Sequence, residues 1–141
     1  MDIRPLTDAY AVAPQIAPEE VAAIRAAGYT TLINNRPDAE IPPALQSAAM
    51  RAAAEAAGLV FVDNPVIGGA ISDANAAAQG AAIAAAAGPV LAYCASGNRS
   101  SIVWALSQAG RVATDDLVAT AARWGYNLEP FRARIEAAAA G

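Results

Sequence analysis

The sequence contains no histidine, no lysine and only one cysteine among its 141 residues, so all nine basic residues are arginine. The missing side chains exclude histidine-based catalytic triads, lysine Schiff-base chemistry and metal sites that contain histidine. A single cysteine also excludes an intramolecular disulfide and a thiolate zinc cluster. The chemistry that remains is that of one thiol, carboxylates, hydroxyls and arginines.

Charged residues are sparse and scattered, with 9 basic against 13 acidic residues and a formal net charge of −4. No basic stretch has the character of a nucleic-acid footprint. No window holds the ~20 large apolar residues that a membrane span needs, because the alanine-rich stretch at residues 77–87 is short and weakly apolar. The N-terminus lacks the apolar segment of a signal peptide. We therefore expect a cytoplasmic protein in a reducing compartment, without a membrane or nucleic-acid partner.

Apolar periodicity and turn residues predict helices that alternate with strands up to Cys94, followed by helices only. Strands are expected at residues 10–13, as a short edge strand, and at 29–33, 59–62 and 89–94. Helices are expected at residues 18–27, 42–57, 72–88 with Ser72 as N-cap, from the apolar residues at 102–106 to 109, at 114–124 and from 129, with fraying over 137–141. This order predicts an α/β fold, a three-layer sandwich in which helices flank a small, mainly parallel sheet of four to five strands. We expect one domain spanning residues 1–141.

The single cysteine lies where the pattern changes from strand to helix. Cys94 ends an apolar strand, and the small-residue loop that follows it leads through Arg99 into an apolar helical pattern. A helix N-terminus offers unpaired N–H groups and a partial positive charge, which stabilise a bound anion or a thiolate. Gly97 lets successive N–H groups turn inward as a nest for an oxyanion. Cys94 is therefore a candidate nucleophile in its thiolate form.

The residues after Cys94 have the groups that an oxyanion needs. Backbone N–H groups would line the nest, and the planar fork of Arg99 would clamp two anion oxygens. Ser100 or Ser101 could donate a hydroxyl hydrogen bond to the sulfur. Arg36, which follows the strand at 29–33, is either a second anion contact or the partner of Asp38 or Glu40 in an ion pair. The predicted anion-binding residues are Ala95, Ser96, Gly97, Asn98, Arg99, Ser100 and Arg36.

The motif Cys94-x-x-Gly97-x-Arg99-Ser100 resembles the phosphate-binding loop of the cysteine-dependent protein tyrosine phosphatase superfamily. Nearly the whole chain resembles the bacterial beta-lactamase hydrolase-like, phosphatase-like family, which is also described as a domain of unknown function and as sulfur transferases. The segments that carry this resemblance are residues 13–16, 33–38, 64–66 and the loop itself. The resemblance implies a dual-specificity-phosphatase-like fold and a cysteinyl-phosphate mechanism, with no metal or organic cofactor.

Two features of the loop depart from the phosphatase pattern. Tyr93 stands where these phosphatases place a histidine, so one aid to thiolate formation is absent. Four residues separate Cys94 from Arg99 instead of five. That shorter spacing resembles the loop of rhodanese sulfurtransferases, in which the cysteine carries a persulfide.

The primary hypothesis is a phosphatase-like hydrolase that acts on a phosphate monoester through a Cys94 thiophosphate intermediate. Its partner would be a small anionic substrate or a phosphorylated molecule. Asp73 is the first candidate for the proton donor, ahead of Asp63 and Asp38, although Asp73 is equally suited to the first turn of a capped helix. The alternatives are a rhodanese-like sulfurtransferase and a binding module that holds an anion without turnover. The sequence leaves the substrate and the oligomeric state open.

Overall fold

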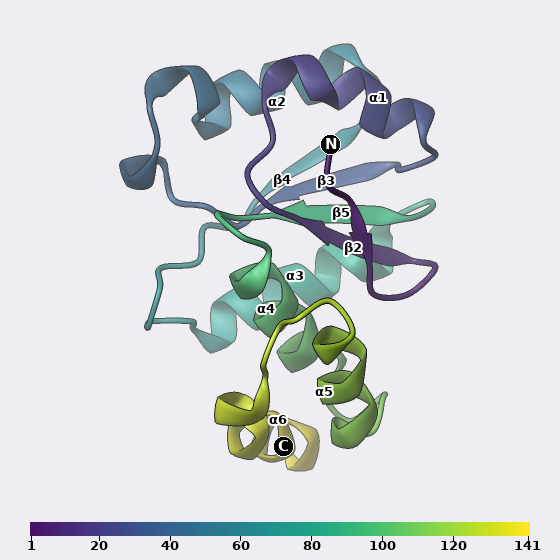
Figure 1. Ribbon diagram of the computed structural model, residues 1–141, viewed down its shortest axis with the longest axis vertical. Coiled ribbons are helices and arrows are strands. Elements are labelled where there is room, and N and C mark those ends of the chain that lie inside the picture. Colours follow the sequence, from purple (N-terminus) through teal and green to yellow (C-terminus); the bar gives the residue numbers. More distant parts are fainter.

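Five strands form one sheet in the computed structural model, which describes residues 1–141. The strands are β1 (Arg4–Pro5), β2 (Tyr10–Ala13), β3 (Thr31–Asn34), β4 (Val60–Asp63) and β5 (Val90–Tyr93). Their order is β1-β2-β5-β3-β4, and every neighbouring pair is parallel except β1 and β2 (Figure 1). The predicted mainly parallel sheet is confirmed, with β5 at its centre.

Parallel register brings the carboxyl ends of four strands to one edge of the sheet. Tyr93 pairs with Ala13 on one side and with Asn34 on the other, and Asn34 pairs with Asp63. The segments that leave β2, β3, β4 and β5 therefore start beside one another. The loop that begins at Cys94 emerges from the central strand, where open α/β sheets collect their ligands.

Helices cover both faces of the sheet, which confirms the three-layer sandwich. The helices are α1 (Val21–Ala26), α2 (Ser47–Ala56), α3 (Asp73–Ala85), α4 (Asn98–Gln108), α5 (Thr114–Ala122) and α6 (Arg132–Ala140). Figure 1 shows α1 and α2 on one face and α3 and α4 on the other, with α5 and α6 packed beyond α4. No helix has the length and apolar character needed to cross a membrane.

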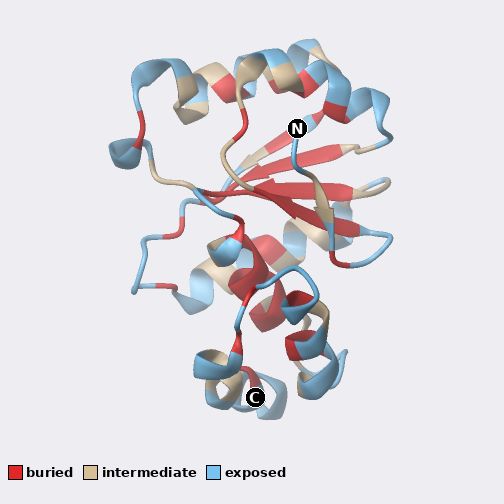
Figure 2. Ribbon diagram, in the orientation of Figure 1, coloured by how far each residue is buried: buried red, intermediate tan, exposed pale blue.

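The core is divided by the sheet into two apolar clusters. The larger, with 18 buried residues, lies under α3 to α6, and the smaller, with 12, lies under α1 and α2. Every residue of β2, β3 and β5 is buried, as expected for parallel strands covered on both faces (Figure 2). Helix α4 is buried continuously from Ser100 to Leu106. The helix that follows the Cys94 loop is thus fixed firmly in the core.

The structure differs from the expected elements mainly at their ends. Strand β2 is not an edge strand, because the two-residue strand β1 pairs with it on its outer side. Short 3-10 turns, η1 (Pro18–Glu20), η2 (Asp38–Glu40), η3 (Pro43–Leu45) and η4 (Glu129–Phe131), precede or replace helical turns. The expected fraying from residue 137 is wrong, since α6 continues to Ala140. Strand β1 and the 3-10 turns are not predicted because elements of two or three residues are too short to show a periodic pattern of apolar residues.

Candidate active site

Strand β5 delivers Cys94 to the floor of a tight loop. The residue is buried, with 1 % of its surface exposed. Its Sγ atom accepts a hydrogen bond from the N–H of Gly97, with an N···S distance of 3.1 Å. Gly97 has φ of +94°, in the left-handed region that favours glycine, and it is the N-cap of α4. The loop therefore folds back over the sulfur and turns at once into the helix.

Several backbone donors of this loop are unused inside the protein. The N–H groups of Ala95, Ser96, Arg99 and Ser100 make no hydrogen bond, whereas that of Asn98 donates to Ser96 Oγ at 3.2 Å. The unused N–H groups stand at the amino end of α4, an 11-residue helix whose dipole is positive at that end. These donors and the dipole favour a bound anion beside the sulfur.

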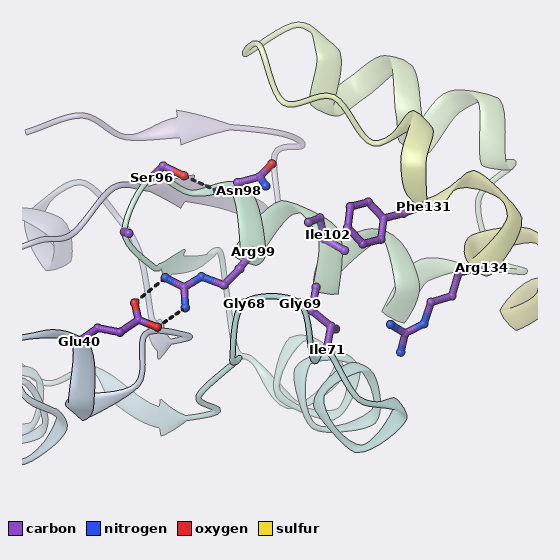
Figure 3. Close-up of a pocket in the computed structure, with 11 residues that line it drawn as sticks. Glu40, Gly68, Gly69, Ile71, Ser96, Asn98, Arg99, Ile102, Phe131 and Arg134 are labelled. Carbon is purple, nitrogen blue, oxygen red and sulfur yellow. Dashed lines mark hydrogen bonds and ion pairs between the residues drawn. The ribbon is translucent and has the colours of Figure 1, made fainter.

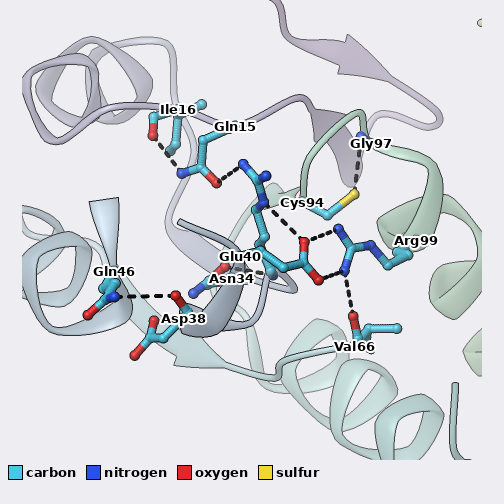
Figure 4. A network of polar contacts seen from close by, with 11 residues as sticks. Gln15, Ile16, Asn34, Asp38, Glu40, Gln46, Val66, Cys94, Gly97 and Arg99 are labelled. Carbon is cyan, nitrogen blue, oxygen red and sulfur yellow. Dashed lines mark hydrogen bonds and ion pairs between the residues drawn. The ribbon is translucent and has the colours of Figure 1, made fainter. Parts of the chain in front are cut away.

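The guanidinium of Arg99 is already held by a carboxylate. Its two terminal nitrogens donate to the two oxygens of Glu40, each at 2.8 Å, and Nη1 also donates to the carbonyl oxygen of Val66 at 2.8 Å (Figure 4). The hydrogen bonds that Arg99 donates to Glu40, and to a lesser degree the nearby Cys94 sulfur, raise the pKa of Arg99. Arg99 in turn lowers the pKa of Glu40. Arg99 thus holds Glu40 as an ionised carboxylate.

Arg36 reaches the site only through Glu40. Its Nε donates to Glu40 Oε1 at 3.2 Å, and its Nη1 donates to Gln15 Oε1 at 3.4 Å. Of the two expectations for Arg36, the structure shows the ion pair and no contact with the loop. The sequence identified Glu40 only as one possible partner of Arg36, although it proves to be central to the site.

The two serines after Arg99 support the loop from below. Ser100 Oγ donates to Asn35 Oδ1 at 2.9 Å, and Ser101 Oγ donates to the carbonyl oxygen of Gly97 at 2.8 Å. Both serines are fully buried in the first turns of α4. The expected hydroxyl hydrogen bond to the Cys94 sulfur is therefore absent, because both hydroxyls have closer acceptors beneath the loop.

A buried polar network, missed from the sequence, ties the start of α4 to β3 and α3. Asn35 accepts from Ser100 and from Gln79 Nε2 at 3.1 Å, and donates to Gln79 Oε1 at 2.9 Å. Gln79 also donates to the hydroxyl of Tyr10 at 3.0 Å, and that hydroxyl donates to the Ser100 carbonyl oxygen at 2.8 Å. Nearly every polar group here has a partner, so the network rigidifies the loop.

Tyr126, which follows α5, braces the loop from the side. Its hydroxyl donates to the carbonyl oxygen of Ser96 at 2.8 Å and accepts from Arg4 Nη1 at 2.7 Å. A Cβ atom on Gly97 would overlap this hydroxyl. Gly97 is therefore required both by its backbone conformation and by the close approach of Tyr126.

A cavity of about 470 Å³ opens beside the loop (Figure 3). This volume lies within the range of small-ligand sites. One end is polar and includes Arg99 and Glu40, and the other carries an apolar wall and a second arginine. The lining residues are Glu40, Gly68, Gly69, Ile71, Ala95, Ser96, Asn98, Arg99, Ile102, Phe131 and Arg134.

Comparison with known proteins identifies the family of this chain. The sequence profile of the phosphatase-like domain of beta-lactamase hydrolase-like proteins matches residues 2–111. The chain belongs to this family. A beta-lactamase hydrolase-like protein from Xylella fastidiosa is 36 % identical over 130 residues, which cover 91 % of this chain and 30 % of that protein. The chain thus spans less than a third of the length of this curated relative.

Solved structures agree with this assignment. A Neisseria meningitidis protein, provisionally assigned as a phosphatase, is 32 % identical, with a TM-score of 0.83 and coverage of 98 % of this chain and 99 % of that one. Pseudomonas aeruginosa TpbA in complex with phosphotyrosine has a TM-score of 0.61 at 15 % identity, with coverage of 94 % and 89 %. At that identity the second likeness shows the fold alone.

The candidate proton donors of this phosphatase-like domain lie away from the loop. Asp73 is the first residue of α3, with a fully exposed side chain 3.4 Å from Arg134, and it borders a neighbouring hollow. Asp38 accepts from the N–H of Ser47, and Asp63 accepts from Asn34. Both border a third hollow, and partial burial raises the pKa of Asp63. None of these aspartates lines the cavity beside Cys94, whose one acidic lining residue is Glu40.

Tyr93, the residue in the place of the expected histidine, points away from the loop. It is buried in the cluster under α1 and α2, on the face of the sheet opposite α4. Its hydroxyl has no hydrogen-bond partner, and burial raises its pKa. Tyr93 therefore fills the core and takes no part in the polar contacts of the sulfur.

Proposed function

We propose that this domain hydrolyses phosphate monoesters with Cys94 as the nucleophile. The observation that carries the proposal is the closed loop at the amino end of α4, in which the Gly97 N–H donates to Sγ and Arg99 stands in the first turn of the helix. A thiolate at that position is stabilised by the N–H group, the helix dipole and the guanidinium. The free N–H groups of the loop suit the equatorial oxygens of a phosphoryl group.

The reaction takes two displacements at phosphorus. The Cys94 thiolate forms an S–P bond while the ester P–O bond breaks, and the departing oxygen carries away the electron pair and takes up a proton from solvent water. Water then attacks the phosphorus, loses a proton and breaks the S–P bond, which releases inorganic phosphate and restores the thiolate. Loop N–H groups and Arg99 hold the oxygens through both steps.

Substrate binding requires an exchange of anions at Arg99. The phosphoryl oxygens take the place of the Glu40 carboxylate on the guanidinium fork, and Glu40 keeps its contact with Arg36. Because Arg36 retains the displaced carboxylate near the cavity, the two negative groups exchange without leaving either unpaired. Arg36 is then a positioning residue for Glu40.

The identity of the leaving group follows from the position of the carboxylates. Glu40 is ionised by its two arginines and is a poor proton donor, and Asp73 lies outside the cavity. Phenols leave from phosphate esters far more readily than alkyl alcohols when protonation is weak. We therefore expect aryl phosphates to be the better substrates.

The test is phosphate release from a small aryl phosphate. Wild type should turn over, and Cys94→Ser should lose activity by about three orders of magnitude or more. Arg99→Lys keeps the charge but loses the planar fork, so it should retain only a small part of kcat/KM. Activity that persists in Cys94→Ser would contradict the mechanism in which Cys94 is the nucleophile.

The loop length supports sulfur transfer as a second candidate function. Four residues separate Cys94 from Arg99, as in rhodanese-like loops. Thiosulfate would pass its outer sulfur to Cys94 as a persulfide and release sulfite, and cyanide would then remove that sulfur as thiocyanate. Mass spectrometry after thiosulfate treatment should show one added sulfur on Cys94 if this reaction occurs. A domain that binds phosphate but carries out neither reaction is an anion-binding module.

A further inference from the structure

The cavity beside Cys94 continues past the loop to a wall made by the C-terminal part of the chain. Figure 3 shows Arg99 at one side and Arg134 at the opposite side, with apolar residues between them. These residues are Ile71, Ile102 and Phe131, of which the two isoleucines are buried. A cavity with cations at both ends and an apolar middle is complementary to a ligand with an anionic group at each end and an apolar centre.

Arg134 is free to take a further anion. Its one ionic partner is Asp73 at 3.4 Å, and the side chains of Arg134 and Asp73 are 38 % and 106 % exposed. Exposed pairs of this kind contribute little free energy. Its neighbour Arg132 on the same helix contacts Asp115 at 2.5 Å and Glu129 at 3.0 Å. Of these two arginines of α6, the one that lines the cavity is the weakly paired one.

We propose that Phe131 and Arg134 select aromatic phosphate monoesters whose ring carries a second anionic group. The phosphate lies at Arg99, the ring lies between Ile71, Ile102 and Phe131, and the second anion lies at Arg134. Packing of the substrate ring against Phe131 adds an aromatic contact to the free energy gained when the ring leaves water. This proposal rests on the proposed function, because it places the scissile phosphate on the Cys94 loop. Phe131 and Arg134 are specificity residues and take no part in the chemical step.

Two probes that differ only in charge test the proposal. They are the phosphate ester of para-hydroxyphenylpropanoate and the same ester with its carboxylate replaced by a carboxamide. Both leave as nearly the same phenol, so the ratio of their kcat/KM values reports recognition of the second anion. The same probes are titrated against Cys94→Ser by calorimetry, which measures binding without turnover.

The wild type should favour the carboxylate over the carboxamide by about fivefold, the upper value for a partly exposed ion pair. In Arg134→Gln this ratio should fall close to one. Arg111→Gln removes the same charge from an arginine outside this cavity and should keep the wild-type ratio. Phe131→Ala should raise KM for both esters, because it removes apolar contact with the ring.

The outcomes separate this proposal from the proposed function. If both esters are hydrolysed at equal rates and bind Cys94→Ser with equal affinity, the proposed selection by Arg134 is wrong. The proposed phosphatase function would be unaffected by that result. A preference in binding without hydrolysis would overturn the phosphatase and support the second-anion site. A preference that persists in Arg134→Gln, or disappears equally in Arg111→Gln, would also contradict the proposal, since it would then reflect overall charge.

Discussion

In the proposed phosphatase, Glu40 would decide how readily Arg99 accepts a substrate. Its side chain is 34 % exposed and gives both oxygens to Arg99, so it competes for the fork that a phosphate needs. An internal carboxylate of this kind lowers anion affinity but keeps the arginine correctly placed while the site is empty of substrate. Removing the charge of Glu40 therefore shows whether the carboxylate mainly competes for the Arg99 fork or mainly positions it.

We expect Glu40→Gln to bind inorganic phosphate more tightly, by about two- to fivefold, because a neutral amide releases the Arg99 fork at lower cost. Isothermal calorimetry measures the affinity. Glu55→Gln is the matched control, since Glu55 forms an ion pair with Arg51 on α2, outside the cavity. Weaker phosphate binding in Glu40→Gln would mean that the carboxylate positions Arg99 more than it competes.

The same carboxylate makes stability depend on pH. Arg99 first, and then Arg36, lower the folded-state pKa of Glu40 below its ordinary value of 4.5. The ionised form is thus favoured by folding, so its contribution is complete above pH 4.5 and is lost as the pH falls through the folded value. The wild type should exceed Glu40→Gln by about 1 kcal/mol or less at pH 7, because the pair is partly exposed. Urea unfolding at pH 7 and pH 3 measures this difference, and a gap that persists or widens at pH 3 contradicts it.

Substitution of Gly97 tests whether the conformation of the Cys94 loop is needed for activity. Gly97→Ala combines a left-handed φ with overlap of the Tyr126 hydroxyl, so it should destabilise the fold and lower kcat/KM by more than tenfold. Gly28→Ala is the control, because Gly28 has φ of +105° and nothing within 4 Å of the added carbon. That variant should lose only about 1–2 kcal/mol of unfolding free energy and keep its activity. Equal effects of both substitutions on activity would show that Tyr126 does not brace the loop.

Helix α3 illustrates how one element serves the site from a distance. Its 13 residues are mostly alanine and small polar residues, and Gln79 is the one that is buried. Gln79 bonds to the side chains of Tyr10 in β2 and of Asn35, the residue after β3, so the helix contributes a polar link where an apolar stripe would be ordinary. A buried amide of this kind is costly to leave unpaired, which makes it a sensitive position.

We expect Gln79→Leu to destabilise the domain by about 3 kcal/mol, because it removes one hydrogen-bond partner from each of the buried side chains of Asn35, Asn64 and Tyr10. Chemical denaturation measures the change. Gln108→Leu is the control at the end of α4, where the side chain contacts only Ser107, and it should change stability by about 0.5 kcal/mol or less. Equal effects would show that the network adds no stability.

The elements show why part of the site was predictable and part was not. Cys94, Gly97 and Arg99 lie within six residues that join a strand to a helix, so the local pattern is enough to place them there. Glu40 and Tyr126 reach the loop from elsewhere in the chain, and no periodicity reports such contacts. Asp73 is the proton donor expected from its position after β4, yet it is the first residue of α3 and does not line the cavity.

At the scale of the whole molecule, the fold concentrates its chemistry at one edge of the sheet. Segments after β2, β3, β4 and β5 supply Gln15, Glu40, Val66 and Arg99 to a single set of contacts. An anion bound there touches elements that unfold together in a cooperative domain. Its binding free energy should therefore add to the stability of the entire chain.

Inorganic phosphate should raise the thermal midpoint of this domain, although the net charge of −4 opposes anion binding. At a phosphate concentration of 100 times Kd, linkage adds about 2.7 kcal/mol, which for a chain of this size is a rise of roughly 5–10 °C. Arg99→Gln should remove this rise, while Arg111→Gln should preserve it at matched ionic strength. Cys94→Ser should also preserve it, because the sulfur is the attacking atom and the loop N–H groups and Arg99 supply the binding. An equal rise in all four proteins would indicate a general salt effect, and would place phosphate somewhere other than the Cys94 loop.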